Sequence, residues 1–190
     1  MSRRPAAFLD RDGTIIYDAS YVRDPDDVVL LDGAGEAIKT LNARGIAVIL
    51  VTNQSGIARG WLTHDDYARV HARLVELLAE DGARLDGAYM CPHHPDITGP
   101  CECRKPGLAL YRQAIEEHGL DPARSLFTGD RWRDVAAAED LGGLGIMLDV
   151  ASTPPEDHKR ARIEGVLTAG SLRDAVDRYL ATLPAASSGQ

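Results

Sequence analysis

The chain has 190 residues, of which 44% are hydrophobic and 26% charged, and its formal net charge is −8. This length and balance are typical of one soluble globular domain with a sizeable core. The acidic balance argues against a nucleic-acid or anionic-membrane partner, and no apolar stretch is long enough to cross a bilayer. We therefore predict a cytoplasmic protein with one domain over residues 1–183, a flexible tail over 184–190 and a small molecule as its partner.

Strand-like and helix-like segments alternate along the chain. Short apolar runs that stop at polar residues indicate strands, whereas apolar residues at helical spacing indicate helices. The predicted strands cover residues 6–10, 46–52, 87–91, 125–129 and 145–150, and the predicted helices cover 33–44, 63–78, 108–118 and 133–141. A strand and a helix with Ser171 as its N-cap follow, and residues 92–106 form a loop. This alternation predicts an α/β fold with a doubly wound parallel sheet, and no insertion is long enough for a large cap domain.

Three predicted strands end in polar residues that could share one site. Asp10 closes the first strand, and Asp130 follows the fourth. Thr52 and Asn53 close the second strand. In open parallel sheets, ligands bind at the carboxyl ends of the strands. Each feature alone has an ordinary explanation, namely a solvated turn for Asp10, an N-cap for Asp130 and turn chemistry for Thr52, but their coincidence favours a functional site.

The aspartate pair in "AFLDRDGTII" suits phosphoryl transfer. Asp10 could attack phosphorus and form an aspartyl-phosphate, which divides one hard displacement into two easier ones. Mg²⁺ prefers oxygen ligands, and the carboxylates of Asp10 and Asp130 could hold it beside the phosphoryl group. Asp12 lies close enough to protonate the leaving oxygen and then to activate water. Thr52 and Asn53 could donate hydrogen bonds to the phosphoryl oxygens, and a lysine would neutralise further charge.

Five candidate metal ligands lie in the segment "CPHHPDITGPCEC": Cys91, His93, His94, Cys101 and Cys103. Thiolates and imidazoles suit Zn²⁺, and structural zinc sites take four such ligands in a tetrahedron. The loop between the two closely spaced ligand pairs lets the pairs meet, and all three cysteines of the chain are then used. The alternative is a free buried Cys91 with an exposed pair of cysteines. The spacing favours zinc but does not choose between His93 and His94.

Four motifs, which in chain order are "DRDGT", "VTNQSG", "CRKP" and "GDRWRD", resemble those of the haloacid dehalogenase (HAD) superfamily phosphatases. The resemblance covers residues 6–150 and implies a HAD-like sheet, with Asp10 as the nucleophile and Asp12 as the general acid and base. It also implies a Mg²⁺ site made by Asp10, the Asp12 carbonyl and Asp130, with phosphoryl contacts from Thr52, Asn53 and Lys105. Asp134 is expected to cap a helix or support the site rather than to bind the ion.

The same resemblance chooses between the two histidines, because the Zn²⁺ ligands that it implies are Cys91, His93, Cys101 and Cys103. A closed tetrahedron has no open position, so this zinc is expected to be structural. Its role would be to fix Arg104 and Lys105 over the active site, since preorganised charge stabilises a transition state better than mobile charge does. Chelation should then lower turnover without changing Mg²⁺ binding.

The zinc loop and "NQSGIARG" resemble one branch of the superfamily, which removes the 7-phosphate of heptose 1,7-bisphosphates. This implies a sugar-phosphate pocket lined by Asp18, Tyr21, Thr52, Asn53, Gln54, Ser55, Arg104, Lys105 and Arg131. The guanidinium of Arg104 suits the second phosphate, although a solvated loop arginine is an equally ordinary reading of it. The chain departs from the branch at Ala19, where a histidine is common, and at Arg131, where a lysine is common.

Three other functions stay open on the sequence. Histidinol phosphate is an alternative substrate for the same chemistry, because its phosphatases share the zinc loop. A catalytically idle, zinc-stabilised interaction module would keep the fold without needing every motif residue. A nucleic-acid end phosphatase is disfavoured by the acidic balance. No sustained apolar stripe is left over for an interface, so a monomer is expected.

Overall fold

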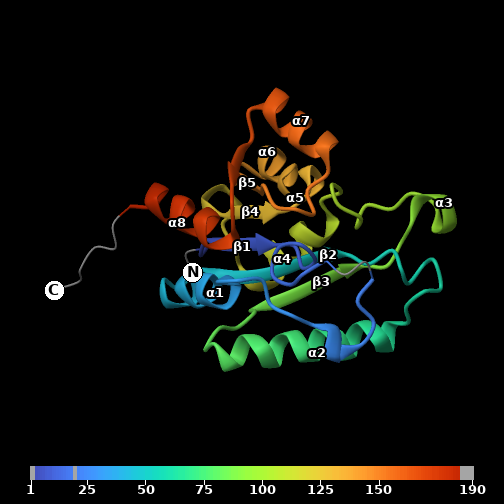
Figure 1. Ribbon diagram of the computed structural model, residues 1–190. Coiled ribbons are helices and arrows are strands. Elements are labelled where there is room, and N and C mark those ends of the chain that lie inside the picture. The colour runs from blue at the N-terminus through green and yellow to red at the C-terminus, as the bar shows by residue number, and fades with distance from the viewer. Residues whose placement is uncertain (1–2, 19–20, 185–190) are drawn as a thin grey trace.

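The computed structural model describes residues 3–18 and 21–184. Within them, six strands form one sheet in the order β3-β2-β1-β4-β5-β6. The strands are β1 (Ala6–Leu9), β2 (Ala47–Asn53), β3 (Gly87–Cys91), β4 (Leu126–Gly129), β5 (Leu144–Leu148) and β6 (Leu167–Ala169), and all pairings are parallel. Helices lie on both sides of the sheet (Figure 1), which confirms the doubly wound α/β prediction. The predicted tail lies outside the described residues apart from Pro184, and so does Ala19.

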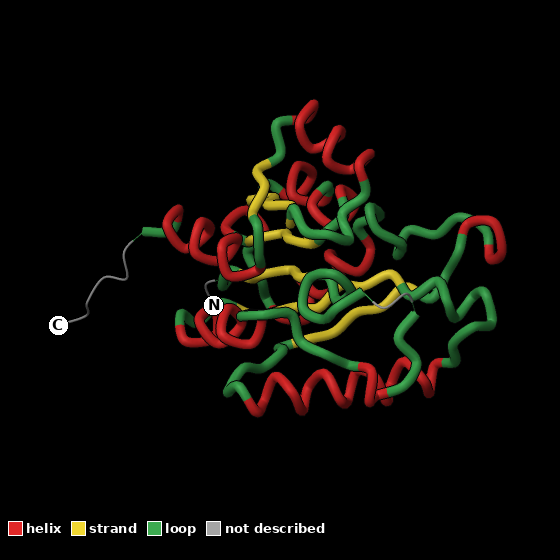
Figure 2. The backbone as a smooth tube through the Cα atoms, viewed as in Figure 1, coloured by secondary structure: helices red, strands yellow, loops and turns green. Residues whose placement is uncertain are grey.

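Helices and short 3-10 turns connect the strands (Figure 2). They are α1 (Ala34–Ala43), α2 (His64–Glu80), α3 (Pro95–Thr98), α4 (Ala109–His118), α5 (Trp132–Val135), α6 (Ala137–Leu141), α7 (Pro155–Glu164) and α8 (Leu172–Thr182), with η1 (Pro25–Asp27) and η2 (Pro122–Arg124). Ser171 caps α8 as predicted, because its side chain accepts a hydrogen bond from the Asp174 backbone N–H at 3.1 Å. Among the described helices, none combines the length and the apolar composition that a membrane span requires.

Three helical segments differ from the prediction. The predicted helix over 133–141 is two short helices, α5 and α6, which meet at Ala136. Helix α7 was not predicted, because its sequence "PEDHKRARIE" buries only Ala161 and lacks the apolar periodicity that indicates a helix. Helix α3 falls inside the segment predicted as a loop, where Pro95 occupies its first turn.

Alternate residues of each central strand serve two separate hydrophobic layers. In β1, Ala7 and Leu9 pack with α1, α2 and α8, whereas Phe8 packs with α4 and α6. This is the two-residue period of a strand with both faces covered. The burial fixes the register, in which Leu9 pairs with Leu50 of β2 and with Thr128 of β4. The carboxyl ends of β1, β2 and β4 therefore finish side by side.

The connection order makes this edge a ligand site. After β1 the chain adds β2 and β3 on one side, and then it crosses to add β4, β5 and β6 on the other side. Such a reversal leaves a crevice at the carboxyl ends of the central strands, where α/β sheets bind ligands. Between β1 and α1, the described part of residues 10–33 contains η1 as its one helical turn, so the described chain has no helical cap inserted between these two elements.

Candidate active site

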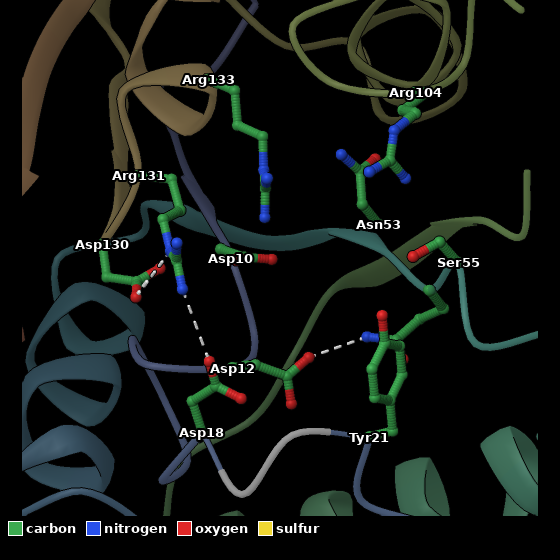
Figure 3. Close-up of a pocket in the computed structure, with 11 residues that line it drawn as sticks. Asp10, Asp12, Asp18, Tyr21, Asn53, Ser55, Arg104, Asp130, Arg131 and Arg133 are labelled. Carbon is green, nitrogen blue, oxygen red and sulfur yellow. Dashed lines mark hydrogen bonds and ion pairs between the residues drawn. The ribbon is translucent and has the colours of Figure 1, made fainter. Parts of the chain in front are cut away.

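A polar pocket of about 250 Å³ opens at the carboxyl ends of the central strands (Figure 3). Its walls come from the segments that follow β1, β2 and β4 and from the loop after β3. The lining residues are Asp10, Asp12, Asp18, Tyr21, Asn53, Gln54, Ser55, Arg104, Asp130, Arg131 and Arg133. Strand ends that are far apart in the sequence thus supply one site, as the sequence predicts.

Three buried carboxylates meet beside this pocket. Oxygen atoms of Asp10, Asp130 and Asp134 lie within 4.8 Å of one another. In a Mg²⁺ octahedron the ligand oxygens are about 3 to 4 Å apart, so a pair of these carboxylates fits one ion. Buried carboxylates are costly unless a positive charge compensates them, which is a second reason why this cluster suits a cation.

Lys105 already compensates two of these carboxylates. Its Nζ lies 2.8 Å from Asp10 Oδ1 and 2.7 Å from Asp134 Oδ1, and it donates a hydrogen bond to the Val51 carbonyl at 2.7 Å. Burial alone would raise the pKa of Asp10, but the charge of Lys105, helped by Arg133, outweighs burial and lowers that pKa. Asp10 is therefore ionised at neutral pH, as a carboxylate nucleophile must be.

Asp12 lies in a network of a different kind. Its carboxylate accepts hydrogen bonds from Arg11 Nη2 at 3.0 Å and from Gln54 Nε2 at 2.8 Å. Burial raises the pKa of Asp12, and the Arg11 charge opposes burial without overcoming it, while the charge of Asp10 adds to the rise. A raised pKa suits a carboxyl group that has to carry a proton to a leaving group.

Asp130 rests on the backbone of Gly13. A Cβ at Gly13 would lie 2.5 Å from Asp130 Oδ2, and the φ of +74° is rare for residues with a side chain, so the "DRDGT" motif needs glycine here. The same oxygen accepts a hydrogen bond from Ser152 Oγ at 2.8 Å and lies 3.3 Å from Arg131 Nε. Burial, with the nearby charge of Asp134, raises the pKa of Asp130 to about 6.

Three residues predicted to contact the phosphoryl group have protein partners in the structure. Lys105 and Thr52 are buried and do not line the pocket, and Thr52 Oγ1 accepts a hydrogen bond from Gln54 Nε2 at 2.9 Å. Asn53 does line the pocket, but its side chain clamps the backbone of Lys105. Asn53 Oδ1 accepts from the Lys105 N–H at 3.0 Å, and Asn53 Nδ2 donates to the Lys105 carbonyl at 3.2 Å. The clamp fixes the "CRKP" motif to the end of β2.

The remaining predicted substrate residues do gather around the pocket, and they are Asp18, Tyr21, Gln54, Ser55, Arg104 and Arg131. Arg104 and Arg131 lie on opposite sides of it (Figure 3). Arg104 Nη1 donates to the His93 carbonyl at 3.1 Å, and Arg131 Nη2 lies 3.7 Å from Asp18 Oδ2. The pocket thus presents one guanidinium from the loop after β3 and another from the segment after β4.

Tyr21 is held in an unusual backbone conformation at the pocket wall. Its φ is +67°, in the left-handed region that bulky residues rarely adopt. The ring packs edge-on against Trp61, with 4.7 Å between ring centroids, and a Cβ at Gly56 would lie 2.6 Å from Tyr21 Cδ1. Such outliers persist where neighbours hold them, often at functional sites. Trp61 and Gly56, which provide that support, were not singled out from the sequence.

Two arginines of the site were also missed. Arg11 is 1% exposed, because its guanidinium is enclosed by Asp12, Gln54 and the ring of Tyr67. Arg133 lines the pocket, and although burial opposes its charge, the carboxylates of Asp134, Asp10 and Asp130 raise the pKa of Arg133. The one sequence feature that could have indicated a role for these arginines is their position, since Arg11 lies inside the motif "DRDGT" and Arg133 lies inside "GDRWRD".

The loop after β3 brings four sulfur and nitrogen ligands together. Cys91 Sγ lies 3.7 Å from Cys101 Sγ and 3.1 Å from Cys103 Sγ, and the last two sulfurs are 3.5 Å apart. His93 Nδ1 lies 3.2 Å from Cys103 Sγ and 3.7 Å from Cys91 Sγ. Ligands at Zn–S distances of about 2.3 Å in a tetrahedron are about 3.8 Å apart, so these four atoms fit around one Zn²⁺ ion.

His94 lies outside this cluster. Its Nε2 lies 2.6 Å from Arg59 Nη2, and its Nδ1 lies 3.3 Å from the Asp96 backbone nitrogen at the start of α3. The geometry therefore favours His93 as the metal ligand. The cluster is also joined to the pocket, because Cys91 pairs with Asn53 across the sheet and the Cys91 carbonyl accepts from the Gln54 N–H at 2.7 Å.

Comparison with known proteins agrees with this site. The model of the HAD-hydrolase-like family matches residues 102–175. These residues include Cys103 at the end of the cysteine-rich loop, Lys105 and the "GDRWRD" motif. The fold, the paired aspartates and this match together define a HAD-like hydrolase.

Relatives of known name narrow the class further. The D-glycero-beta-D-manno-heptose-1,7-bisphosphate 7-phosphatase of Haemophilus ducreyi is 43% identical over 144 residues, which cover 73% of this chain and 79% of the relative. The protein of the same name from Vibrio cholerae is 36% identical over 182 residues, which cover 93% of this chain and 96% of the relative. The crystal structure of D,D-heptose 1,7-bisphosphate phosphatase from B. bronchiseptica, complexed with magnesium and phosphate, superposes with a TM-score of 0.81 at 31% identity and covers 94% of this chain and 99% of that chain. The chain belongs to this family of HAD-like phosphatases.

Proposed function

We propose that the protein removes the 7-phosphate of D-glycero-D-manno-heptose 1,7-bisphosphate with Mg²⁺ as its cofactor. The observation that carries the proposal is the meeting of Asp10, Asp12 and Asp130 in one pocket with arginines on two sides. The names of the relatives at 43% and 36% identity support this substrate. The magnesium and phosphate named with the B. bronchiseptica structure support the cofactor and the chemistry.

Asp10 is the proposed nucleophile. Its carboxylate attacks the phosphorus of the 7-phosphate, the bond from phosphorus to the sugar oxygen breaks, and an aspartyl-phosphate forms. Asp12 gives its proton to the departing sugar oxygen and then takes a proton from the water that hydrolyses the aspartyl-phosphate. Inorganic phosphate and the heptose 1-phosphate leave, and Asp10 returns to its ionised form.

Asp10 and Asp130 would hold the Mg²⁺ ion, with the Asp12 carbonyl as the third protein ligand. The bound ion supplies positive charge against the phosphoryl oxygens, which lets an anionic nucleophile approach. Asp134 has a different part, because one of its oxygens pairs with Lys105 and the other accepts from the Arg131 backbone N–H at 3.0 Å. Asp134 therefore positions Lys105 and caps α5, in keeping with the supporting role predicted for it.

Arg104 is proposed to bind the second phosphate of the substrate. It faces the pocket from the side opposite Arg131 (Figure 3). A guanidinium presents a planar fork of donors that matches two phosphate oxygens. Asp18, Tyr21 and Ser55 line the space between the two arginines and would contact the sugar hydroxyls.

Cys91, His93, Cys101 and Cys103 would hold a structural Zn²⁺ ion. Four protein ligands close such a site, so the ion's contribution is to immobilise the loop. Arg104 follows Cys103 directly and is bonded to the His93 carbonyl at 3.1 Å. Fixing the loop therefore fixes the guanidinium that the second phosphate would meet.

We also propose that the protein acts as a monomer of one domain in the cytoplasm, on a small molecule. The net charge of −8 supports the expectation that nucleic acid and anionic membranes are not its partners. Gel filtration with light scattering tests the monomer, since a dimer would double the mass.

A side-by-side kinetic assay tests the substrate. Heptose 1,7-bisphosphate, heptose 7-phosphate and histidinol phosphate are compared by phosphate release in Mg²⁺. We expect the bisphosphate to be preferred over the monophosphate by about 10- to 100-fold in kcat/KM, because a hydrogen bond to a charged group contributes roughly 1.5–3 kcal/mol.

Arg104→Gln should remove that preference, whereas Arg112→Gln, on the exposed face of α4, is the matched control and should keep it. A higher kcat/KM for histidinol phosphate would replace the proposed substrate. Failure to hydrolyse any of the three esters would favour the idle interaction module.

A further inference from the structure

Lys105 is expected to neutralise the phosphoryl group, but its ammonium group already has partners within the protein. Nζ donates a hydrogen bond to the Val51 carbonyl at 2.7 Å and forms ion pairs with Asp10 at 2.8 Å and Asp134 at 2.7 Å. The side chain is 1% exposed and does not line the pocket. A bond from Lys105 to a substrate oxygen would replace one of these contacts. A phosphoryl group at Asp10 therefore calls for a second cation from the protein.

Arg133 is placed to be that cation. It stands on α5, and its side chain points into the pocket toward Asp10 (Figure 3). The side chain is 39% exposed, so a ligand in the pocket can reach it. In the described part of the chain, its one carboxylate neighbour within ion-pair range is Asp134 Oδ1, at 4.0 Å from Nε, and Nε has no hydrogen-bond acceptor. A separation of 4.0 Å is too long for a hydrogen bond.

The other two arginines that line the pocket have acceptors. Arg131 Nε bonds to Asp130 Oδ2 at 3.3 Å, and Arg104 Nη1 donates to the His93 carbonyl at 3.1 Å. Of the three pocket guanidinium groups, and with respect to the residues that the structure describes, Arg133 is the one that makes no hydrogen bond to a protein acceptor. Its position beside Asp10 also differs from that of Arg104, which lies across the pocket (Figure 3).

We propose that Arg133 binds the phosphoryl group that is transferred to Asp10, with its N–H groups on the non-bridging oxygens. The proposal rests on the proposed phosphatase function and adds a substrate-binding residue to it. Charge in the transition state of phosphoryl transfer spreads over these equatorial oxygens, and a guanidinium fork can meet two of them at once. Arg133 and Arg104 then have separable roles, one at the reacting phosphate and one at the remote phosphate.

The rival reading is that Arg133 only balances the charge of the neighbouring carboxylates when no cation is bound. The two readings differ in what the side chain does to Mg²⁺. A charge balancer competes with the ion, so that its removal would tighten Mg²⁺ binding. A phosphoryl ligand leaves Mg²⁺ affinity alone and changes phosphate affinity instead.

The test compares the wild type with Arg133→Gln and Arg133→Lys on heptose 1,7-bisphosphate and on p-nitrophenyl phosphate. Inorganic phosphate serves as a competitive inhibitor, and Mg²⁺ affinity is measured by calorimetry. We expect Arg133→Gln to lower kcat/KM by about 100-fold on both esters, as loss of one preorganised donor does, and to weaken phosphate inhibition by about tenfold. Arg133→Lys should recover part of both losses, because it keeps the charge and loses the fork.

Arg112→Gln is the matched control and should behave as the wild type, and thermal unfolding shows whether each variant is folded. If Arg133→Gln does not fold, the test uses Arg133→Lys alone. Weaker inhibition of this variant by phosphate would then support the proposal, and unchanged inhibition would contradict it. Tighter Mg²⁺ binding with unchanged phosphate inhibition would overturn the proposal, and so would a loss confined to the bisphosphate. If the wild type hydrolyses p-nitrophenyl phosphate but not the heptose bisphosphate, the substrate proposal fails, while the Arg133 comparison on this ester and on phosphate still decides its role.

Discussion

The two clusters of candidate metal ligands in this molecule are built in opposite ways. The carboxylates of Asp10, Asp130 and Asp134 come from segments more than a hundred residues apart, and the sheet brings them together. All three are buried, and Lys105 forms ion pairs with two of them, Asp10 and Asp134. The thiols and imidazole between Cys91 and Cys103 come from one short loop, and all but Cys91 are partly exposed.

This difference in construction indicates what makes each of the two clusters rigid. The acidic cluster inherits a fixed geometry from β1 and β4, so its residues are placed before any ion binds. The loop has little packing of its own, because the residues of α3 at its tip are exposed, and a structural metal would supply the missing constraint. Chemistry should therefore depend on the acidic cluster, and the placement of Arg104 should depend on the cysteine cluster.

Removal of the nucleophile should give the largest effect. We expect Asp10→Asn to lower kcat by at least about 10⁴-fold, as the loss of nucleophiles does elsewhere. Zinc content should stay at the wild-type level, because Asp10 makes no contact with the loop ligands. Residual turnover within about a hundredfold of the wild type would show that another group attacks phosphorus.

Loss of zinc should have an intermediate effect. We expect a zinc-selective chelator, or Cys103→Ser, to lower turnover by about 10- to 100-fold, the range seen when groups around a metal site are disturbed. Mg²⁺ affinity should stay unchanged, since the proposed Mg²⁺ ligands, Asp10 and Asp130, directly follow β1 and β4 and lie outside the loop. His94→Asn is the matched control and should retain both zinc and activity. Wild-type turnover in a protein shown by metal analysis to be zinc-free would contradict the dependence of the Arg104 position on the cysteine cluster.

Asp130 gives a prediction about stability and pH. The pKa of its carboxyl is raised from 3.8 to about 6, so the folded protein without Mg²⁺ prefers the protonated form. The raised pKa of Asp130 therefore stabilises the folded protein fully below about pH 4, and this stabilisation is lost as pH rises to about 6. The free energy of unfolding falls by roughly 3 kcal/mol at most over this range. Asp130→Asn should stabilise the Mg²⁺-free protein at pH 7.5 and have little effect at pH 4.

Denaturant unfolding at the two pH values measures this difference. Added Mg²⁺ should stabilise the wild type and not the Asp130→Asn variant, because the ion binds only where its carboxylate is present. An equal difference between the two proteins at pH 4 and at pH 7.5 would contradict the prediction.

The smallest expected effect is at Ser152. Its hydroxyl donates to Asp130 Oδ2 at 2.8 Å, while Gly13 and Arg131 hold the same carboxylate from other sides. Ser152→Ala should weaken Mg²⁺ binding by about fivefold, which is the effect of a hydrogen bond of about 1 kcal/mol. A Mg²⁺ titration of turnover measures it, and Ser125→Ala, whose hydroxyl bonds backbone groups at the far end of β1, is a control for the loss of a serine.

The strands and the acidic site could be predicted because each has a recognisable sequence pattern. Buried strands need continuous apolar runs, and polar residues directly after such runs mark the edge where ligands bind. Asp10, Asp12 and Asp130 stand at such positions. Helix α7 gave no apolar pattern of this kind, since Ala161 is its one buried residue and most of its other residues are charged.

The roles of the cations could not be predicted for a different reason. Lys105, Arg11 and Arg133 occur in polar segments that give no sign of burial. Whether their charges face substrate or protein depends on which carboxylates the fold places within reach. Lys105 turns inward to Asp10 and Asp134, whereas Arg133 is left facing the pocket.

The clamp between Asn53 and Lys105 affects how the cysteine-rich loop, residues 91–105, can vary in length among related proteins. Cys91 is paired to β2 at one end of residues 91–105, and Lys105 is held to the same strand at the other end. Both anchor points are therefore set by one strand, whatever the length of the chain between them. Insertions at the exposed tip, between Asp96 and Ile97, should be accommodated without displacing either anchor. The tip thus offers a place to attach a tag or surface linker to the folded enzyme while the strand-end aspartates stay where they are.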